Sequence, residues 1–197
     1  MEGEMTRRII RSYYAPVDYI LLFFVCSFFG WVWEVGLTWF QLGRFANRGV
    51  LTGPWLPLYG SGAVLVLVLL RRWFGHPGQT FLLSAGLCTL LEYACGWFLE
   101  RTTGLRWWDY SQYRFDLQGR VSLESAAVFG LGCCIVIYWA APKLGELLDR
   151  IPGRSKWLLA GALLTLFGID VLRAWAAPNI GVGVAQAVPT AVSLPRG

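Results

Sequence analysis

Residues Val17–Leu42 read VDYILLFFVCSFFGWVWEVGLTWFQL, an apolar run with two acidic side chains and no basic one. A helix of about 20 mostly apolar residues spans the hydrocarbon core of a bilayer, so this run predicts a transmembrane helix. Pro16 precedes it and suits the first helical turn, where the missing proline N–H has no helical partner in any case. The run is too long for a signal peptide and lacks a small-residue cleavage site, so we expect it to be retained.

Four more apolar runs follow along the chain, at Trp55–Leu70, Gln79–Leu99, Val121–Ala141 and Trp157–Ala176. Hydrophobic residues make up 56% of the sequence and charged residues 15%, against about 25% charged in ordinary globular domains. This predicts an all-α, polytopic integral membrane bundle of about five transmembrane helices. We divide the chain into a basic N-terminal segment (1–16), one membrane domain (17–176) and a flexible tail rich in Ala, Val, Pro and Gly (177–197).

The charges and cysteines exclude several classes of protein. The net charge of +5 contains no long Lys/Arg block, so we expect no nucleic acid as a partner. All five cysteines lie in apolar runs without a CxxC pair or a histidine partner, which predicts neither a metal site nor a disulfide framework. Lys and Arg are almost balanced between the two sides of the predicted membrane domain. Because both lysines share a side with the N-terminus, we predict a cytoplasmic N-terminus and an external tail.

Two acidic residues inside the predicted spans are the strongest functional signal. A carboxylate at the centre of a membrane helix costs a few kcal/mol, so Glu34 and Glu92 are expected to face protein or water. Both belong to polar stripes at helical spacing: Ser27, Glu34, Thr38 and Gln41 in the first run; Ser84, Cys88, Glu92, Gly96 and Glu100 in the third. The two helices run in the same direction, which predicts that the two carboxyls share a layer and bind a cation or a proton. The alternative is a structural role, in which each carboxyl is neutral or paired with an arginine.

The connectors after these two helices carry the other candidate residues. Glycines and prolines in residues 43–60 prevent a continuous helix, and irregular backbone at membrane depth has to be buried or line a wet cavity. Residues 107–120 combine aromatic rings with Asp and Arg, although paired tryptophans are also typical of an interfacial aromatic belt. We expect Arg48 and Arg120 to close a cavity above the two acids. The predicted substrate- or ion-binding residues are Glu34, Glu92, Arg48, Arg120, Asn47, Trp108, Asp109 and Tyr59.

One further acid lies in the fifth run. Asp170 and Arg173 are three residues apart and are predicted to pair along one helix face.

A set of short motifs in the same order resembles the bacterial membrane family named putative ABC-transporter type IV. The motifs are Gly30-Trp31 with Glu34, Asn47-Arg48-Gly49 with Leu51, Gly53-Pro54, Pro57, Tyr59-Gly60, Glu92-Tyr93, Trp108-Asp109-Tyr110-Ser111 and Gly119-Arg120. The resemblance covers about residues 18 to 142. It implies a small multi-pass protein of the bacterial inner membrane, nominally a permease, and it specifies no mechanism.

The sequence assigns no catalytic residue and no cofactor. It has no GxxxxGK[ST] phosphate loop, so any ATP-binding site belongs to a separate subunit, and it lacks HExxH and GxSxG motifs. The leading hypothesis is a transport-type protein with an unknown small substrate. The alternatives are a membrane enzyme acting on a lipid or headgroup, and a non-transport assembly or regulatory component. The lipid bilayer is the expected surrounding, and a homo-oligomer is left open.

Overall fold

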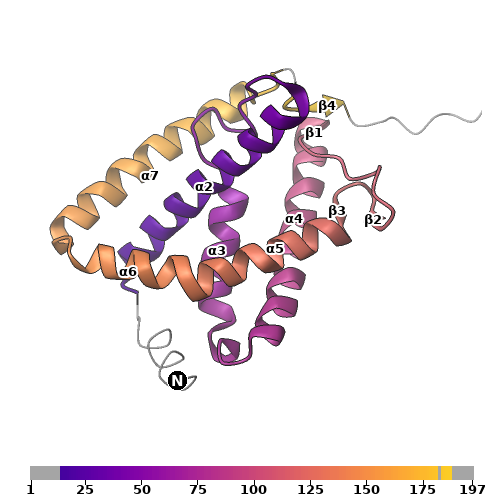
Figure 1. Ribbon diagram of the computed structural model, residues 1–197. Helices are drawn as coiled ribbons and strands as arrows, with labels where there is room; N and C mark the ends of the chain where they lie inside the picture. Colours follow the sequence, from indigo (N-terminus) through magenta and orange to yellow (C-terminus); the bar gives the residue numbers. More distant parts are fainter. Residues whose placement is uncertain (1–13, 182, 188–197) are drawn as a thin grey trace, which may run out of the picture.

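The computed structural model describes residues 14–181 and 183–187 and confirms an all-α membrane bundle (Figure 1). Four helical segments are long and apolar enough to cross a membrane: α2 (Pro16–Leu42), α4 (Pro77–Thr103), Leu123–Asp149 and α7 (Gly153–Ala176). The basic segment predicted at 1–16 lies mostly outside the described residues. The small strands are β1 (Leu105–Arg106), β2 (Asp116–Leu117), β3 (Val121–Ser122) and β4 (Gln186–Ala187).

The two central helices end in the same way. α2 stops at Gly43 and α4 at Gly104, and both glycines adopt positive φ angles, of 65° and 70°. An L-residue with a side chain rarely takes this conformation, so the glycines release the chain from each helix at a defined residue.

The second predicted span forms a shorter helix than expected. α3 (Pro57–Leu69) has 13 residues, or about 20 Å at 1.5 Å per residue, which is less than the roughly 30 Å of a hydrocarbon core. A 3-10 turn, Arg71–Trp73, then leads toward α4. The helix within the predicted crossing at Trp55–Leu70 is therefore shorter than a bilayer, and the irregular connector before Pro57 covers the remaining length beside α2.

The fourth predicted span is longer than expected. α5 (Leu123–Ile135) continues through a π-helical turn (Val136–Ala140) into α6 (Ala141–Asp149). Pro142 lacks an N–H for the preceding turn, and the wider π turn directly before it accommodates this loss without ending the helix. The predicted end at Ala141 is therefore wrong by about two helical turns.

Both long connectors fold back toward the middle of the helix that they follow. The Leu56 amide donates to the Ser27 carbonyl at 3.0 Å, so α3 begins beside the middle of α2. The Ser125 hydroxyl lies 3.2 Å from the Glu92 carboxylate, so α5 begins beside the middle of α4. The second halves of α2 and α4 are thus lined by irregular chain rather than by full-length neighbouring helices (Figure 1).

The hydrophobic core lies among the helices, away from the two connectors. Its buried residues come from α2, α3, α4 and the α5–α6 segment, and include Leu22, Val66, Cys88, Cys133 and Ile137. Cys88 and Cys133 lie 3.5 Å apart, sulfur to sulfur, and all five cysteines are free.

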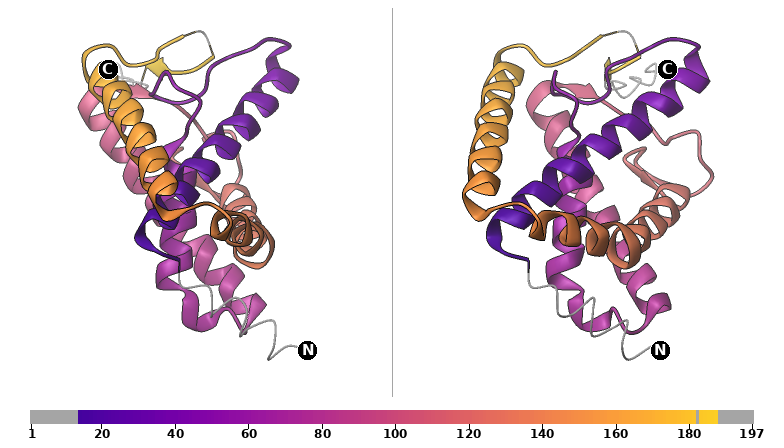
Figure 2. Two further views of the ribbon diagram at one scale, coloured as in Figure 1. Left: turned by 90° about the vertical axis from the view of Figure 1, so that its left-hand side faces the viewer. Right: turned by 60° about the vertical axis from the view of Figure 1, so that its left-hand side comes forward.

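Helix α7 runs along the side of the bundle and is attached at both ends (Figure 2). Near its start, the Lys156 ammonium lies 2.9 Å from the Asp18 carboxylate of α2, and both residues are buried. Near its end, Asp170 contacts the connector after α2.

Part of the predicted flexible tail is packed against the connectors. The Asn179 side chain donates to the carbonyls of Asn47 and Gly49, and Val184 is buried. β4 pairs with β1 in an antiparallel register. These residues of the predicted flexible tail thus pack against the connectors, while residues 182 and 188–197 lie outside the described part of the chain.

Candidate functional site

A cavity of about 970 Å³ lies between the second halves of α2 and α4, the two connectors and the end of α7. Six of the predicted site residues contribute to its wall: Glu34, Arg48, Tyr59, Glu92, Trp108 and Asp109. Two predicted site residues, Asn47 and Arg120, are not among the residues that line it in the described structure. Glu34 and Glu92, which were expected to share one interior layer, both line this cavity.

The predicted polar stripe on α4 faces the interior. Ser84, Cys88, Glu92 and Gly96 are all buried, as their four-residue spacing requires. On α2, Ser27 and Thr38 are buried as well, whereas Gln41 lies exposed at the end of the helix where it lines the cavity.

Glu34 has a neutral and a charged neighbour. The Tyr59 hydroxyl donates to its Oε1 at 2.6 Å, and the Nε of Arg48 lies 3.7 Å from its Oε2. The two charged side chains are 25% and 18% exposed, so the pair lies at the cavity wall and not in the dry core. A carboxyl paired with an arginine is the arrangement described by the structural alternative for Glu34.

Glu92 is buried and has hydroxyl neighbours only. The Tyr110 hydroxyl lies 3.0 Å from Oε1 and the Ser125 hydroxyl lies 3.2 Å from Oε2, while 2% of the residue is exposed. Among the residues that the structure describes, no Lys or Arg lies within ion-pair distance of it. Burial raises the pKa of Tyr110, and negative charge on Glu92 and Glu34 raises it further, so the Tyr110 phenol stays protonated and can donate.

Arg48 holds three segments together at the cavity wall. Its guanidinium donates to the Gly183 carbonyl at 2.8 Å and to the Trp107 carbonyl at 3.2 Å. These bonds join the connector after α2 to the connector after α4 and to the C-terminal segment. Arg48 thus lies beside Glu34, and its carbonyl partners were not predicted.

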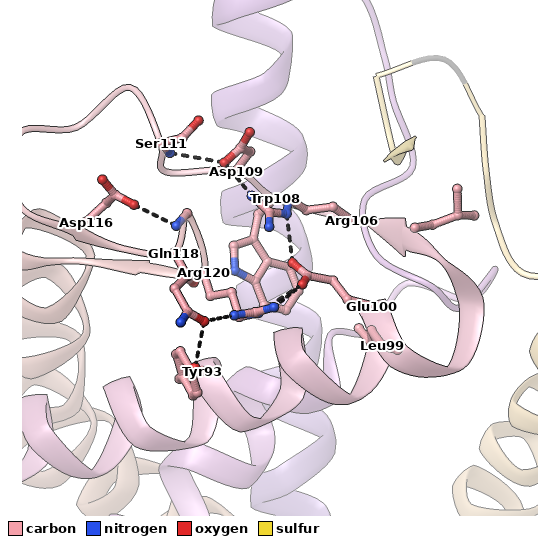
Figure 3. Close-up of polar contacts among 12 residues, drawn as sticks. Tyr93, Leu99, Glu100, Arg106, Trp108, Asp109, Ser111, Asp116, Gln118 and Arg120 are labelled. Carbon is pink, nitrogen blue, oxygen red and sulfur yellow. Dashed lines mark hydrogen bonds and ion pairs between the residues drawn. The ribbon is translucent and has the colours of Figure 1, made fainter. Parts of the chain in front are cut away.

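Arg120 does not reach Glu92. It forms an ion pair with Glu100, to which its Nε donates at 2.9 Å, and the same carboxylate accepts from Nε of Arg106 at 2.7 Å (Figure 3). Glu100 lies on the α4 stripe two turns beyond Glu92, and the fold-back of the connector brings Arg120 level with it. The expectation that Arg120 closes the cavity over Glu92 is therefore corrected: it fastens the connector to the end of α4.

Asp109 and Trp108 also belong to this network. The Asp109 carboxylate lies 2.9 Å from Nη1 of Arg106, and the Trp108 indole donates to the Arg120 carbonyl at 2.8 Å (Figure 3). Burial opposes ionisation of Asp109, but the Ser111 amide and the Arg106 charge outweigh it and lower the pKa of Asp109.

Asn47 shapes the first connector without lining the cavity. Its side-chain oxygen accepts from the Trp31 indole at 2.6 Å, and its amide donates to the Thr52 carbonyl at 2.8 Å. These bonds fix the turn that brings the chain back toward α2.

Asp170 has different partners from those predicted. It accepts hydrogen bonds from the Thr52 amide, the Gly53 amide and the Trp55 indole at 3.1, 2.8 and 2.9 Å, and no ion pair with Arg173 occurs in the described structure. The predicted Asp170–Arg173 pair is therefore wrong, because unpaired amides of the irregular connector compete for the carboxylate. The glycines and prolines of that connector were the sequence signal for this contact, because such an irregular segment leaves backbone N–H donors without partners.

The site has no evident place for a metal ion. Within residues 14–181 and 183–187, no three His, Cys, Asp or Glu side chains gather closely enough to hold one.

Comparison with known proteins identifies the family of the chain. No curated protein and no solved structure matches it. The family model described as "Putative ABC-transporter type IV" matches residues 21–174, which include both acids, both connectors and Asp170. The chain is therefore a multi-pass membrane protein that belongs to this family.

Proposed function

We propose that this protein is a transport-type membrane protein whose cavity receives an unknown small substrate. The observation that carries the proposal is the position of Glu34 and Glu92 at the wall of one cavity, on two separate apolar helices. Intramembrane acids of this kind are costly, and they are typical of substrate and ion pathways. The two connectors add aromatic and polar groups to the same wall, as expected for a site that binds a small molecule.

The proposal includes a location and a direction. We place the protein in the bacterial inner membrane with its N-terminus in the cytoplasm. α2 begins and α7 ends toward opposite ends of the bundle, which supports placing the two termini on opposite sides (Figure 2). Any ATP-driven step would need a separate ATP-binding subunit, because the chain has no phosphate loop.

The test is transport into proteoliposomes with the cavity open or blocked. The five native cysteines, which include Cys95 at the cavity wall, are first replaced by alanine so that the label reacts only with the introduced thiol. Gln41 is exposed and lines the cavity, so a bulky maleimide on Gln41→Cys is expected to obstruct the site. Glu146 is exposed on α6 and does not line the cavity, so Glu146→Cys with the same label is the matched control.

Uptake of one or more radiolabelled solutes from a panel of cations, anions and neutral compounds should occur with wild type and with labelled Glu146→Cys, and be lost with labelled Gln41→Cys. Absence of uptake for the whole panel, together with a new lipid product made by the purified protein, would replace the transport proposal by the enzyme alternative. Uptake that is equal in both labelled variants would show that the cavity is not the route.

A further inference from the structure

The charges around the cavity are balanced except at one place. Glu34 has Arg48 beside it, and Asp109 has Arg106. Glu92 is the acid at the wall without a cation among the described residues, and it is the most deeply buried of the three. An isolated carboxylate in such a place is unfavourable and tends to be neutralised by a proton or by a cation.

The titratable groups facing Glu92 supply no positive charge. Glu34 of α2, Tyr59 of α3, Cys88 and Cys95 of α4, and Tyr110 of the connector all act on it electrostatically. Each of these groups is neutral or negative at ordinary pH. The neighbour from α5, Ser125, does not titrate.

The hydrogen bonds around Ser125 fit a protonated Glu92. The Ser125 hydroxyl has one hydrogen but two acceptors in reach, Glu92 Oε2 at 3.2 Å and the Ser122 carbonyl at 3.0 Å. It also accepts from the Ser122 amide at 3.0 Å. If Glu92 carries a proton on Oε2, it donates to Ser125, and Ser125 donates to the Ser122 carbonyl. Every polar group is then satisfied, whereas an ionised Glu92 would compete with that carbonyl for one hydrogen.

Aromatic rings at the wall favour an organic cation over a metal ion. Tyr59 and Phe129 both line the cavity, with their ring centres 5.5 Å apart, and Trp108 and Tyr110 line it as well. The faces of such rings attract ammonium groups. A hard metal ion instead needs six or more oxygen ligands, which this largely apolar wall does not provide.

We infer that the cavity binds an organic ammonium ion with an apolar body, and that its binding displaces the proton of Glu92 into the cavity water. The ammonium charge then replaces the proton as the partner of the Glu92 carboxylate, and one O–H bond breaks for each cation bound. This inference rests on the proposed function for its site and adds the class of substrate and a coupling to protons.

The test measures binding and proton release with purified protein in lipid nanodiscs. The probe is benzyltrimethylammonium, whose nitrogen has no proton to lose, and neopentylbenzene is its neutral isostere. In weakly buffered solution, a pH indicator should report about one proton released per cation bound. Affinity should rise about tenfold per pH unit in the range where Glu92 is protonated. Neopentylbenzene should release none.

Two variants locate the proton. Glu92→Gln should abolish release and remove the pH dependence of binding, whereas Glu124→Gln, on the exposed first turn of α5, should behave as wild type. The wild-type measurement stands alone if Glu92→Gln fails to fold. Cation binding without proton release, no binding of the cation, or equal binding of the neutral isostere would overturn the inference. The two tests can fail separately. Uptake of other solutes without cation binding would overturn this inference and leave the transport proposal standing. Proton-linked cation binding without uptake would support this inference and contradict the transport proposal.

Discussion

The Nε of Arg48 lies 3.7 Å from the Glu34 carboxylate, while the rest of the guanidinium is hydrogen-bonded to the backbone carbonyls of Gly183, Val184 and Trp107. The ion pair is long and partly exposed, and such pairs contribute about 0–1 kcal/mol. The carbonyl bonds involve a charged donor, and these contribute about 1.5–3 kcal/mol each. Arg48 is therefore held mainly by the backbone and only secondarily by Glu34.

This relationship predicts an order of stability among variants at the cavity wall. Arg48→Ala should lower the free energy of unfolding by about 2–4 kcal/mol, and Glu34→Gln by about 1 kcal/mol or less, since Tyr59 can still donate to the amide oxygen. Denaturation in detergent micelles measures both. The double variant should be no more stable than Arg48→Ala. Recovery of stability in the double variant would show that the ion pair is the main contact of Arg48.

A second prediction concerns Glu100, which pairs with two arginines at once. Arg106 and Arg120 both donate to its carboxylate, and its side chain is 7% exposed. Glu100→Gln should cost about 3–5 kcal/mol, because Arg120 loses its carboxylate and Arg106 keeps only Asp109. Arg120→Ala should cost less, since Arg106 still neutralises Glu100. Unfolding of both variants and of the exposed control Glu124→Gln measures this. A larger loss for Arg120→Ala than for Glu100→Gln would contradict the shared pairing.

Asp170 gives a third prediction, on the attachment of α7 to the first connector. Asp170→Asn places an amide donor among three hydrogen-bond donors and should lower stability by about 2–3 kcal/mol. Arg173 is exposed one turn away, and Arg173→Ala should change stability by less than about 0.5 kcal/mol. Hydrogen exchange should show faster exchange at Thr52 and Gly53 in Asp170→Asn alone. Equal losses of stability for Asp170→Asn and Arg173→Ala would instead support the Asp170–Arg173 pair inferred from sequence spacing.

The parts of the fold that follow local rules could be predicted from sequence. Apolar length identified the long helices, and four-residue spacing placed Glu92 in the interior. The fold-back of the connectors could not be read in this way, because it depends on contacts between residues far apart in the chain. The fold-back brings Arg120 into contact with Glu100 and Thr52 into contact with Asp170. Charge spacing within one helix missed the contact of Asp170, because the backbone donors of an irregular segment do not appear in a side-chain pattern.

The lowered pKa of Asp109 predicts how acid affects the second connector. A carboxylate whose folded-state pKa is depressed stabilises the fold fully above its unfolded value of about 3.9, and this contribution is lost as pH falls through the folded-state pKa. The stability difference between wild type and Asp109→Asn should therefore be constant at neutral pH and shrink below about pH 4. Unfolding curves from pH 7 to 3 measure it. The exposed control Asp149→Asn should follow wild type in parallel, and a constant difference for Asp109→Asn would contradict the assigned contacts.

The last prediction concerns the buried ion pair between Lys156 of α7 and Asp18 of α2. Their side chains are 10% and 7% exposed, and loss of one partner leaves a buried charge, so Lys156→Met and Asp18→Asn should each cost about 3–5 kcal/mol. The double variant should recover most of that loss, because the Asn side-chain oxygen can still accept the Ala15 amide that Asp18 accepts at 3.0 Å. Lys143, the other lysine of the chain, is exposed, and Lys143→Met is the matched control with an expected change below about 1 kcal/mol. Thermal and chemical unfolding in detergent micelles measure all four variants. Additive losses in the double variant would mean that Asp18 and Lys156 act independently, and that α7 is held to α2 by its apolar contacts instead.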